Sequence, residues 1–313
     1  MEPSPDSNDV HRRLILGGLV GNAAAASTVG ASFLLAKLTN DVVGTSLAIV
    51  NVAIVPVIVG LVAAWWWRKI PMGRGEVALH SMWVCGIGLV GAALAFSEGV
   101  LCLAMAAPLH YGAIALSIGF GHRIFGGSGD GVRVVVLPFA ALGMMLESRW
   151  APPPGPEVFA DEIRIHAPPA AVWPHVVSFA PIAAPPDFWF FRMGLPYPME
   201  TPPGADAVGK ERLCIFSGGV VFKEKVVVFE PNRRLAFDIV EQPPDPELLG
   251  HFETHRGEFE LRDEGDGTTT LIGRSTYTLH MRPHWYFDGW TRHLGRAVHL
   301  RVMENARRLA ESH

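Results

Sequence analysis

The chain changes character near Trp150, and this change constrains its fold more than any other feature. Before Trp150, long apolar runs are separated by short polar segments; after it, charges become frequent and apolar residues alternate with polar ones. Counting Asp, Glu, Lys and Arg, residues 1–150 carry 17 charged side chains and residues 151–313 carry 39. A chain of 313 residues is long enough for two domains. We therefore expect a membrane-embedded first half that holds a water-soluble second half at the membrane.

The first half contains four apolar runs of the length needed to cross a bilayer, which is about 20 residues for a helix. These runs are Leu14–Ala36, Val42–Trp67, Val77–Phe96 and Val100–Phe120. A fifth candidate, Val134–Leu146, has only 13 residues and includes Pro138, so it is short for a spanning helix. The sequence therefore predicts an α-helical transmembrane bundle of four to five helices.

The distribution of basic residues predicts the orientation of this bundle. Seven Lys and Arg residues lie on the side of the N-terminus, and two lie on the opposite side. Because cytoplasmic loops are rich in Lys and Arg, we expect a multi-pass protein of the cell (inner) membrane with a cytoplasmic N-terminus. With five spanning helices the soluble half lies outside the cytoplasm, and with four it lies inside. The expected organisation is a tail at 1–13, a transmembrane region at 14–149, a proline-rich linker at 150–157 and a folded domain at 158–313.

The second half shows the pattern of an α+β domain with an antiparallel sheet. Alternating apolar residues and turn signals predict six strands, at 162–166, 209–216, 220–229, 234–240, 257–262 and 268–281. Asp263–Gly267 predicts a hairpin turn, and a short helix is expected within 167–177. A long helix is predicted at His284–Glu311. A curved sheet that grips this helix commonly leaves an apolar cavity in which ligands bind.

The long helix is expected to be amphipathic because apolar residues recur every three or four positions. This apolar stripe consists of Phe287, Trp290, Leu294, Val298, Val302, Ala306 and Leu309. Four arginines mark the face expected to be in water: Arg292, Arg296, Arg301 and Arg308. We therefore expect the stripe to lie against the sheet.

Two segments and the closing helix resemble the START-like superfamily, also called SRPBCC or polyketide cyclase/dehydrase-like. The segments are Ile163–Pro174 and Glu230–Phe237, and Phe191–Pro198 and Arg256–Phe259 are similar to stretches in uncharacterised bacterial proteins. The resemblance covers about half the chain and implies a helix-grip fold with a cavity for a hydrophobic ligand. Since the superfamily includes lipid carriers, cyclases, hormone receptors and chaperone co-factors, it implies a class of ligand rather than a reaction.

Aromatic and aliphatic residues are the candidates for ligand binding. The candidates are Trp189, Phe191, Phe259, Tyr277, Trp285, Trp290 and Leu294. We expect the aromatic run Phe188–Phe191 to lie near the mouth of the cavity, as an apolar gate or as a segment that dips into the bilayer surface, where tryptophan is favoured. Packing within the core is an equal alternative for this run.

The acid/base candidates are His251, Glu253 and His255, if the domain is an enzyme. Histidines four residues apart share one face of a helix and can form a metal pair, but Gly250 and the following strand argue against a helix here, and a solvated loop is preferred. Three cysteines are too few for a four-cysteine zinc site. We therefore expect no metal and no cofactor. A net charge of −5 in the second half argues against a nucleic-acid partner.

These features lead to three hypotheses of different classes. The leading one is a membrane-anchored START-like domain that binds a hydrophobic small molecule or lipid at the surface of the bilayer, as a carrier or sensor. The alternative is a polyketide cyclase/dehydrase-like enzyme, which requires ionisable groups that converge within the cavity. The third is a structural or signalling module in which the helices are the functional part.

Overall fold

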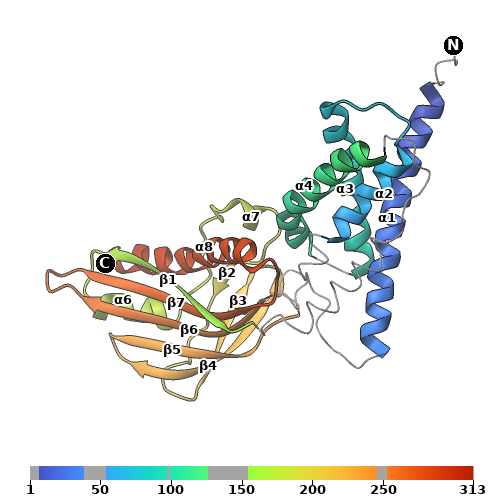
Figure 1. The fold of residues 1–313 in the computed structure, drawn as a ribbon. Coiled ribbons are helices and arrows are strands. Elements are labelled where there is room, and N and C mark those ends of the chain that lie inside the picture. The colour runs from blue at the N-terminus through green and yellow to red at the C-terminus, as the bar shows by residue number, and fades with distance from the viewer. Residues whose placement is uncertain (1–6, 39–53, 97–98, 126–153, 245–251, 313) are drawn as a thin grey trace, which may run out of the picture. The chain divides into compact units, whose positions relative to one another are not determined.

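The computed structural model describes residues 7–38, 54–96, 99–125, 154–244 and 252–312. The chain divides into two compact units, one of residues 1–153 with 281–283 and the other of residues 154–280 with 284–313. The described part of the first unit is helical, and the second contains an antiparallel sheet with helices (Figure 1).

The first unit contains four described helices. They are α1 (Ser7–Leu38), α2 (Val55–Trp66), α3 (Arg74–Phe96) and α4 (Val100–Phe125). By length and composition, α3 and α4 are apolar enough to cross a membrane, whereas α2 is apolar but shorter. The fifth predicted run, Val134–Leu146, lies outside the described residues. Two helices among the described residues therefore meet the requirement for spanning, and the larger bundle stays a prediction.

Close packing in the first unit centres on Trp67, which is completely buried. Its indole nitrogen Nε1 donates to the carbonyl oxygens of Arg13 and Leu14, both at 3.1 Å. A Cβ atom on Gly17 would lie 2.2 Å from this nitrogen. A glycine is therefore required on α1 for the tryptophan to reach its two acceptors, as small residues permit close approach elsewhere in helical bundles.

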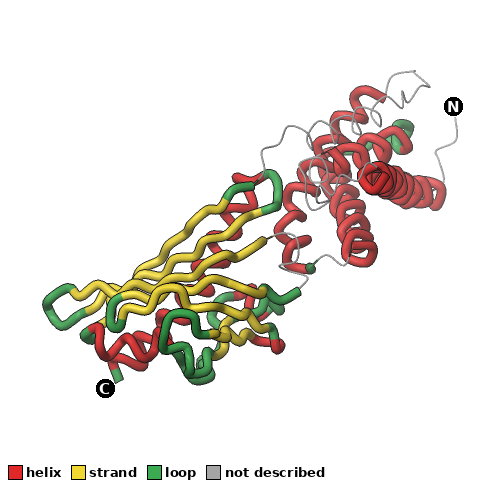
Figure 2. Tube along the Cα trace, turned by 90° about the horizontal axis from the view of Figure 1, so that it is seen from below, coloured by secondary structure: helices red, strands yellow, loops and turns green. Residues whose placement is uncertain are grey.

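The second unit is built on a seven-stranded sheet in the order β1-β7-β6-β5-β4-β3-β2, with every pair antiparallel. The strands are β1 (Pro156–Ile165), β2 (Pro198–Glu200), β3 (Glu211–Phe216), β4 (Val221–Glu230), β5 (Arg234–Glu241), β6 (Phe252–Asp263) and β7 (Thr269–Leu279). The sheet curves, and the helix α8 (His284–Glu311) lies along one of its faces (Figures 1 and 2). This arrangement is the helix grip that the sequence predicts.

Several boundaries differ from the predicted ones. β1 begins at Pro156 within the expected linker, because it pairs with β7 along its whole length and proline is tolerated as the first residue of a strand. β6 begins at Phe252, so the expected loop before residue 257 is mostly strand. β2 and the single-turn helix α7 (Trp189–Arg192) were not predicted, whereas α6 (Pro169–Val177) lies within the predicted helical segment.

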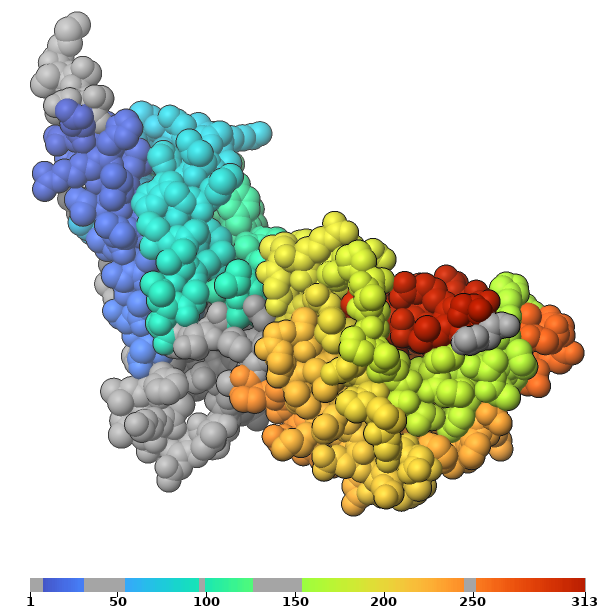
Figure 3. All heavy atoms as spheres, turned by 180° about the vertical axis from the view of Figure 1, so that it is seen from behind, coloured from blue at the N-terminus to red at the C-terminus, as the bar shows by residue number. Residues whose placement is uncertain are grey.

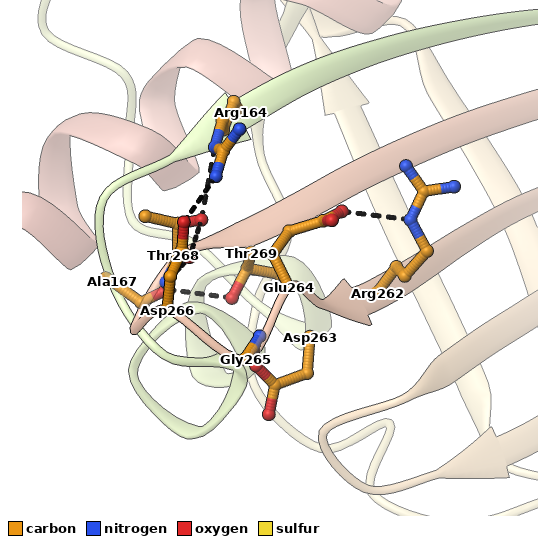
Figure 4. Close-up of polar contacts among 9 residues, drawn as sticks. All are labelled: Arg164, Ala167, Arg262, Asp263, Glu264, Gly265, Asp266, Thr268 and Thr269. Atoms are coloured by element: carbon orange, nitrogen blue, oxygen red, sulfur yellow. Dashed lines mark hydrogen bonds and ion pairs between the residues drawn. The ribbon is translucent and has the colours of Figure 1, made fainter.

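The β6–β7 hairpin has the turn that Asp263–Gly267 predicts. Gly265 and Gly267 have φ angles of 78° and 84°, a region that favours glycine. The Asp263 carboxylate accepts a hydrogen bond from the Gly265 N–H at 2.9 Å. Arg164 of β1 reaches across to Asp266 at 2.6 Å, so the turn is tied to the edge strand (Figure 4).

The buried face of α8 is rotated from the predicted stripe. Trp290, Leu294, Val298 and Leu309 are only partly buried, whereas His299 and Met303 are buried. Arg301, expected on the wet face, donates from Nε to the Pro198 carbonyl at 2.9 Å and from Nη2 to the Ala184 carbonyl at 3.1 Å. The other side of α8 is open to solvent (Figure 3), and there Arg292, Arg296 and Arg308 are exposed as expected.

Candidate functional site

The face of the sheet that is turned toward α8 carries a set of glycines and large apolar residues. In the β1–β7 ladder, Gly273 pairs with Asp161, and in the β6–β7 ladder it pairs with Phe259. A Cβ atom on Gly273 would lie 3.1 Å from the sulfur of Met303. The missing side chain therefore leaves the space that α8 fills, and the helix lies close to the sheet at this point.

A polar network lies inside this apolar interface. The imidazole of His299 on α8 lies between Asp161 of β1 and Ser275 of β7. Its Nδ1 atom is 3.0 Å from Asp161 Oδ2, and its Nε2 atom is 2.8 Å from Ser275 Oγ. Arg296 donates from Nη1 to the other carboxylate oxygen of Asp161 at 3.0 Å. Both oxygens of the buried carboxylate are therefore bonded to nitrogen groups of the helix.

Apolar contacts hold the imidazole of His299 in place. The ring of Phe159 lies 4.7 Å from the His299 ring between centroids and 5.4 Å from that of Tyr277. Phe159 can occupy this position because Gly295 has no side chain: a Cβ atom there would lie 2.2 Å from the phenylalanine ring. The imidazole of His299 is thus held by hydrogen bonds at its two nitrogens and by the ring of Phe159 packed against it.

A second polar group lies at the start of α8. The hydroxyl of Tyr277 donates to Asp288, and Arg292 bonds to Asp288 at 2.8 Å and to Glu157 at 3.1 Å. Burial and the bond to Asp288 raise the pKa of Tyr277, so its hydroxyl stays protonated. One ligand atom each from Glu157, His284 and Asp288 lie within 4.8 Å of one another, the spacing of a metal site. The guanidinium of Arg292 forms ion pairs with both carboxylates, so it already occupies the position of a positive charge between them.

A buried ion pair lies on β3 and β4. Arg212 and Glu224 are directly opposite in the ladder and hydrogen-bonded, with side chains 2% and 5% exposed. The guanidinium also lies 4.5 Å from the ring centre of Phe237. Burial raises the pKa of Glu224, although the charge of Arg212 opposes this shift.

The predicted aromatic run forms a cluster with α8. Phe190 is buried, stacks on Trp189 at 3.7 Å and meets Trp290 edge-on at 5.8 Å between ring centroids. Phe191 is buried against Tyr197. Trp189 is half-exposed. The structure thus brings the candidates Trp189, Phe191 and Trp290 into one region, the α7–α8 aromatic cluster.

The other ligand-binding candidates are scattered. Phe259 belongs to the buried core, and Tyr277 is fully buried against Phe159. Trp285 is 75% exposed at the start of α8, and Leu294 is partly buried. Phe259 and Tyr277 are therefore buried core residues rather than part of an exposed surface.

The acid/base candidates lie on the opposite face of the sheet. His255 Nε2 is 2.6 Å from the hydroxyl of Thr278, whose neighbour Tyr277 points toward α8. Because adjacent residues of a strand point to opposite faces, His255 lies on the outer face. Glu253 pairs with Thr278 in the ladder and is exposed on the same face. His251 lies outside the described residues.

Sequence reasoning missed the three residues of the polar network. Asp161 comes two residues after Phe159, so both side chains point to the same face of a strand. This spacing is the signal in the sequence for a buried carboxylate. His299 comes directly after Val298 of the predicted stripe, and Ser275 lies within the predicted strand at 268–281, where no feature distinguishes it from its neighbours. The pairing of β1 with β7 and the packing of α8 against the sheet bring them together.

Comparisons with known proteins show likeness in structure alone. No model of a protein family matches the chain, and no curated protein matches it. Norcoclaurine synthase from Thalictrum flavum, in complex with a transition-state analogue, is 14% identical with a TM-score of 0.35, over 51% of this chain and 97% of that chain. Zhui aromatase/cyclase from Streptomyces sp. R1128 is 14% identical with a TM-score of 0.34, over 50% of this chain and 94% of that chain. At these values the likenesses carry no argument about function.

Proposed function

We propose that the second unit is a START-like domain that binds an apolar small molecule or lipid at a membrane surface, as a carrier or sensor anchored by the first unit. The observation that carries this proposal is the α7–α8 aromatic cluster, in which buried rings adjoin exposed apolar groups. Trp189 and Met193 are 51% and 55% exposed. Exposed apolar groups next to a buried aromatic core are typical of surfaces that contact an apolar partner.

Membrane anchoring is supported by the outward-facing side chains of α3 and α4. Large apolar residues are exposed along both helices: Leu79, Met82, Val90, Leu94, Val100, Leu116, Phe120 and Ile124. Only 17% of the most apolar stretch of α3 is buried, whereas a core helix of a water-soluble protein would be mostly buried. Lipid is the partner that such surfaces fit.

The orientation of this anchor follows from the positive-inside rule, which favours a cytoplasmic N-terminus in a multi-pass protein of the inner membrane. A reporter that is active only in the cytoplasm, fused after Trp150, tests the arrangement. With five spanning helices we expect an inactive reporter. An active one would put the second unit in the cytoplasm.

Ligand binding is tested on the full chain in detergent with the fluorescent fatty acid cis-parinaric acid. We expect saturable binding, with an affinity that is about tenfold weaker in the double variant Trp189→Ala/Met193→Ala. A tenfold change corresponds to about 1.4 kcal/mol, and half-burial of two apolar side chains contributes at least this much binding free energy. The matched control is Val208→Ala/Val240→Ala, which removes two other exposed apolar side chains. Equal weakening in both variants, or no saturable binding, would refute the proposal.

A second candidate function is acid–base catalysis of the cyclase/dehydrase kind. The observation that favours it is a pair of ionisable groups buried between the sheet and α8, namely Asp161 of β1 and His299 of α8. The acid/base residues of this candidate would be these two, rather than Glu253 and His255 on the outer face.

A further inference from the structure

The proton positions in the Asp161–His299–Ser275 network follow from its donors and acceptors. An ionised carboxylate only accepts hydrogen bonds, so His299 Nδ1 must carry the hydrogen that it shares with Asp161. In a neutral imidazole the other nitrogen is then an acceptor. The hydroxyl of Ser275 therefore donates to Nε2, at 2.8 Å. This is the arrangement in which a histidine can take the proton from a serine nucleophile.

The accessibility of the three side chains suits these roles. His299 and Asp161 are each 7% exposed, while Ser275 is only partly buried and is the most accessible of the three. Arg296 holds the carboxylate from the solvent side, and its own side chain is 62% exposed. The serine is therefore the member of the network that a reagent reaches most readily.

The surroundings of Ser275 indicate the chemistry of its partner. Its neighbours across the sheet are Phe159 on β1 and Gly257 on β6. The ring of Phe237 lies over Gly257, where a Cβ atom would be 2.4 Å away from it. On its cross-strand sides Ser275 thus has apolar neighbours, which suit an acyl chain better than a charged group.

We infer that Ser275 is a nucleophile that accepts the acyl group of an apolar ester, with His299 as its general base and Asp161 as the positioning residue. Ser275 Oγ forms a bond to the carbonyl carbon while its proton moves to His299 Nε2. The bond from that carbon to the ester oxygen then breaks, and the departing alcohol takes the proton from Nε2. Water attacks the acyl-serine by the same route, releases the carboxylic acid and restores the Ser275 hydroxyl.

This inference rests on the proposed binding of an apolar molecule, and its test is separable from that proposal. The full chain in detergent is treated with an alkyl fluorophosphonate, which modifies activated serines, and the modified residue is located by peptide mass spectrometry. We expect modification at Ser275 in the unaltered chain and none there in Ser275→Ala. The control Ser312→Ala, at an exposed position near the C-terminus, should leave modification unchanged.

The base and the positioning residue are tested by rate and by pH profile. His299→Gln should slow modification by about 10²- to 10⁴-fold, the usual contribution of a general base. The rate in the unaltered chain should depend on pH, because only a neutral imidazole can accept the serine proton, and this dependence should vanish in His299→Gln. Asp161→Asn should slow modification and alter the pH profile, and Asp161→Glu should restore part of the rate.

The outcomes separate the two proposals. If the unaltered chain is not modified at Ser275, the nucleophile is refuted, even where cis-parinaric acid binds. If Ser275 is modified but no apolar probe binds, the ligand-binding proposal fails and the nucleophile stands. Modification of Ser275 at the same rate in His299→Gln would refute the role of the histidine. Since the first test needs only the unaltered chain, it does not depend on whether any variant folds.

Discussion

The buried pair of Arg212 and Glu224 is the contact whose disruption we expect to weaken the second unit most. The change is Arg212→Leu, which removes the guanidinium and leaves an apolar side chain of smaller size. Glu224 would then lie in the sheet with its carboxyl group buried and its ion-pair partner gone. Burial already raises the pKa of this carboxyl group, so the variant carries either an unpaired charge or a protonated acid.

The magnitude follows from the burial of both side chains. Breaking a buried pair by removing one partner costs about 3–5 kcal/mol, because the remaining group keeps its desolvation cost without its compensation. Replacing both partners by apolar residues of similar volume is often neutral or stabilising by about 1–4 kcal/mol. We therefore expect Arg212→Leu to be strongly destabilising and the double variant Arg212→Leu/Glu224→Leu to recover most of the loss.

Cys214 provides a local assay of this effect in the full chain. It is buried two residues along β3 from Arg212, and burial raises the pKa of its thiol to about 12. Alkylation by iodoacetamide therefore requires local opening. A loss of about 3–5 kcal/mol corresponds to alkylation that is about 10²- to 10⁴-fold faster, measured at Cys214 by peptide mass spectrometry.

Two results would refute this reasoning. One is an acceleration of less than tenfold in Arg212→Leu, and the other is a double variant that reacts as fast as the single one. The control is Arg233→Leu. The side chain of Arg233 is 80% exposed, and its ion pair with Glu230 is long, at 3.7 Å. Because exposed ion pairs contribute about 0–1 kcal/mol, we expect little change in the rate for this control.

Two further predictions concern packing and pH. A Cβ atom in Gly295→Ala would overlap the ring of Phe159, so we expect overpacking to lower the free energy of unfolding by about 1–3 kcal/mol. The control Gly289→Ala, with nothing within 4 Å of its Cβ atom, should stabilise α8 by up to about 1 kcal/mol. Equal effects of the two variants in calorimetry would contradict this reasoning. Partial burial raises the pKa of Glu258, but hydrogen bonds from Arg234 and Arg274 outweigh it and lower the pKa below 4.5. A carboxylate with a lowered pKa stabilises the fold above its unfolded pKa and loses this effect as pH falls through the folded value. Glu258→Gln should therefore lower the melting temperature at pH 7, by about 2–8 °C for about 1–2 kcal/mol, and the difference should shrink as pH falls below about 4.5; a difference that is constant with pH would contradict the assignment.

Local patterns determined the elements of the second unit because each pattern is a property of neighbouring residues. The 3.6-residue period predicts α8 from His284 to Glu311, the bounds that the structure has. Alternation predicts most of β4, β5 and β7 within one or two residues, and the glycines after Asp263 predict the hairpin turn. The apolar runs likewise predict α3 and α4 as candidate spanning helices.

The tertiary structure decided which faces meet, and hence the candidate site. α8 is amphipathic over a broad arc, so its buried edge depends on the shape of the sheet, and this places His299 rather than Val298 inward. Asp161 and His299 are 138 residues apart, and Ser275 and His299 are 24 residues apart. Their approach depends on the pairing of β1 with β7 and on the glycines that let Phe159 and α8 lie close. No local pattern encodes such a contact, because side chains that meet only through strand register and helix docking leave no periodic signal in the sequence.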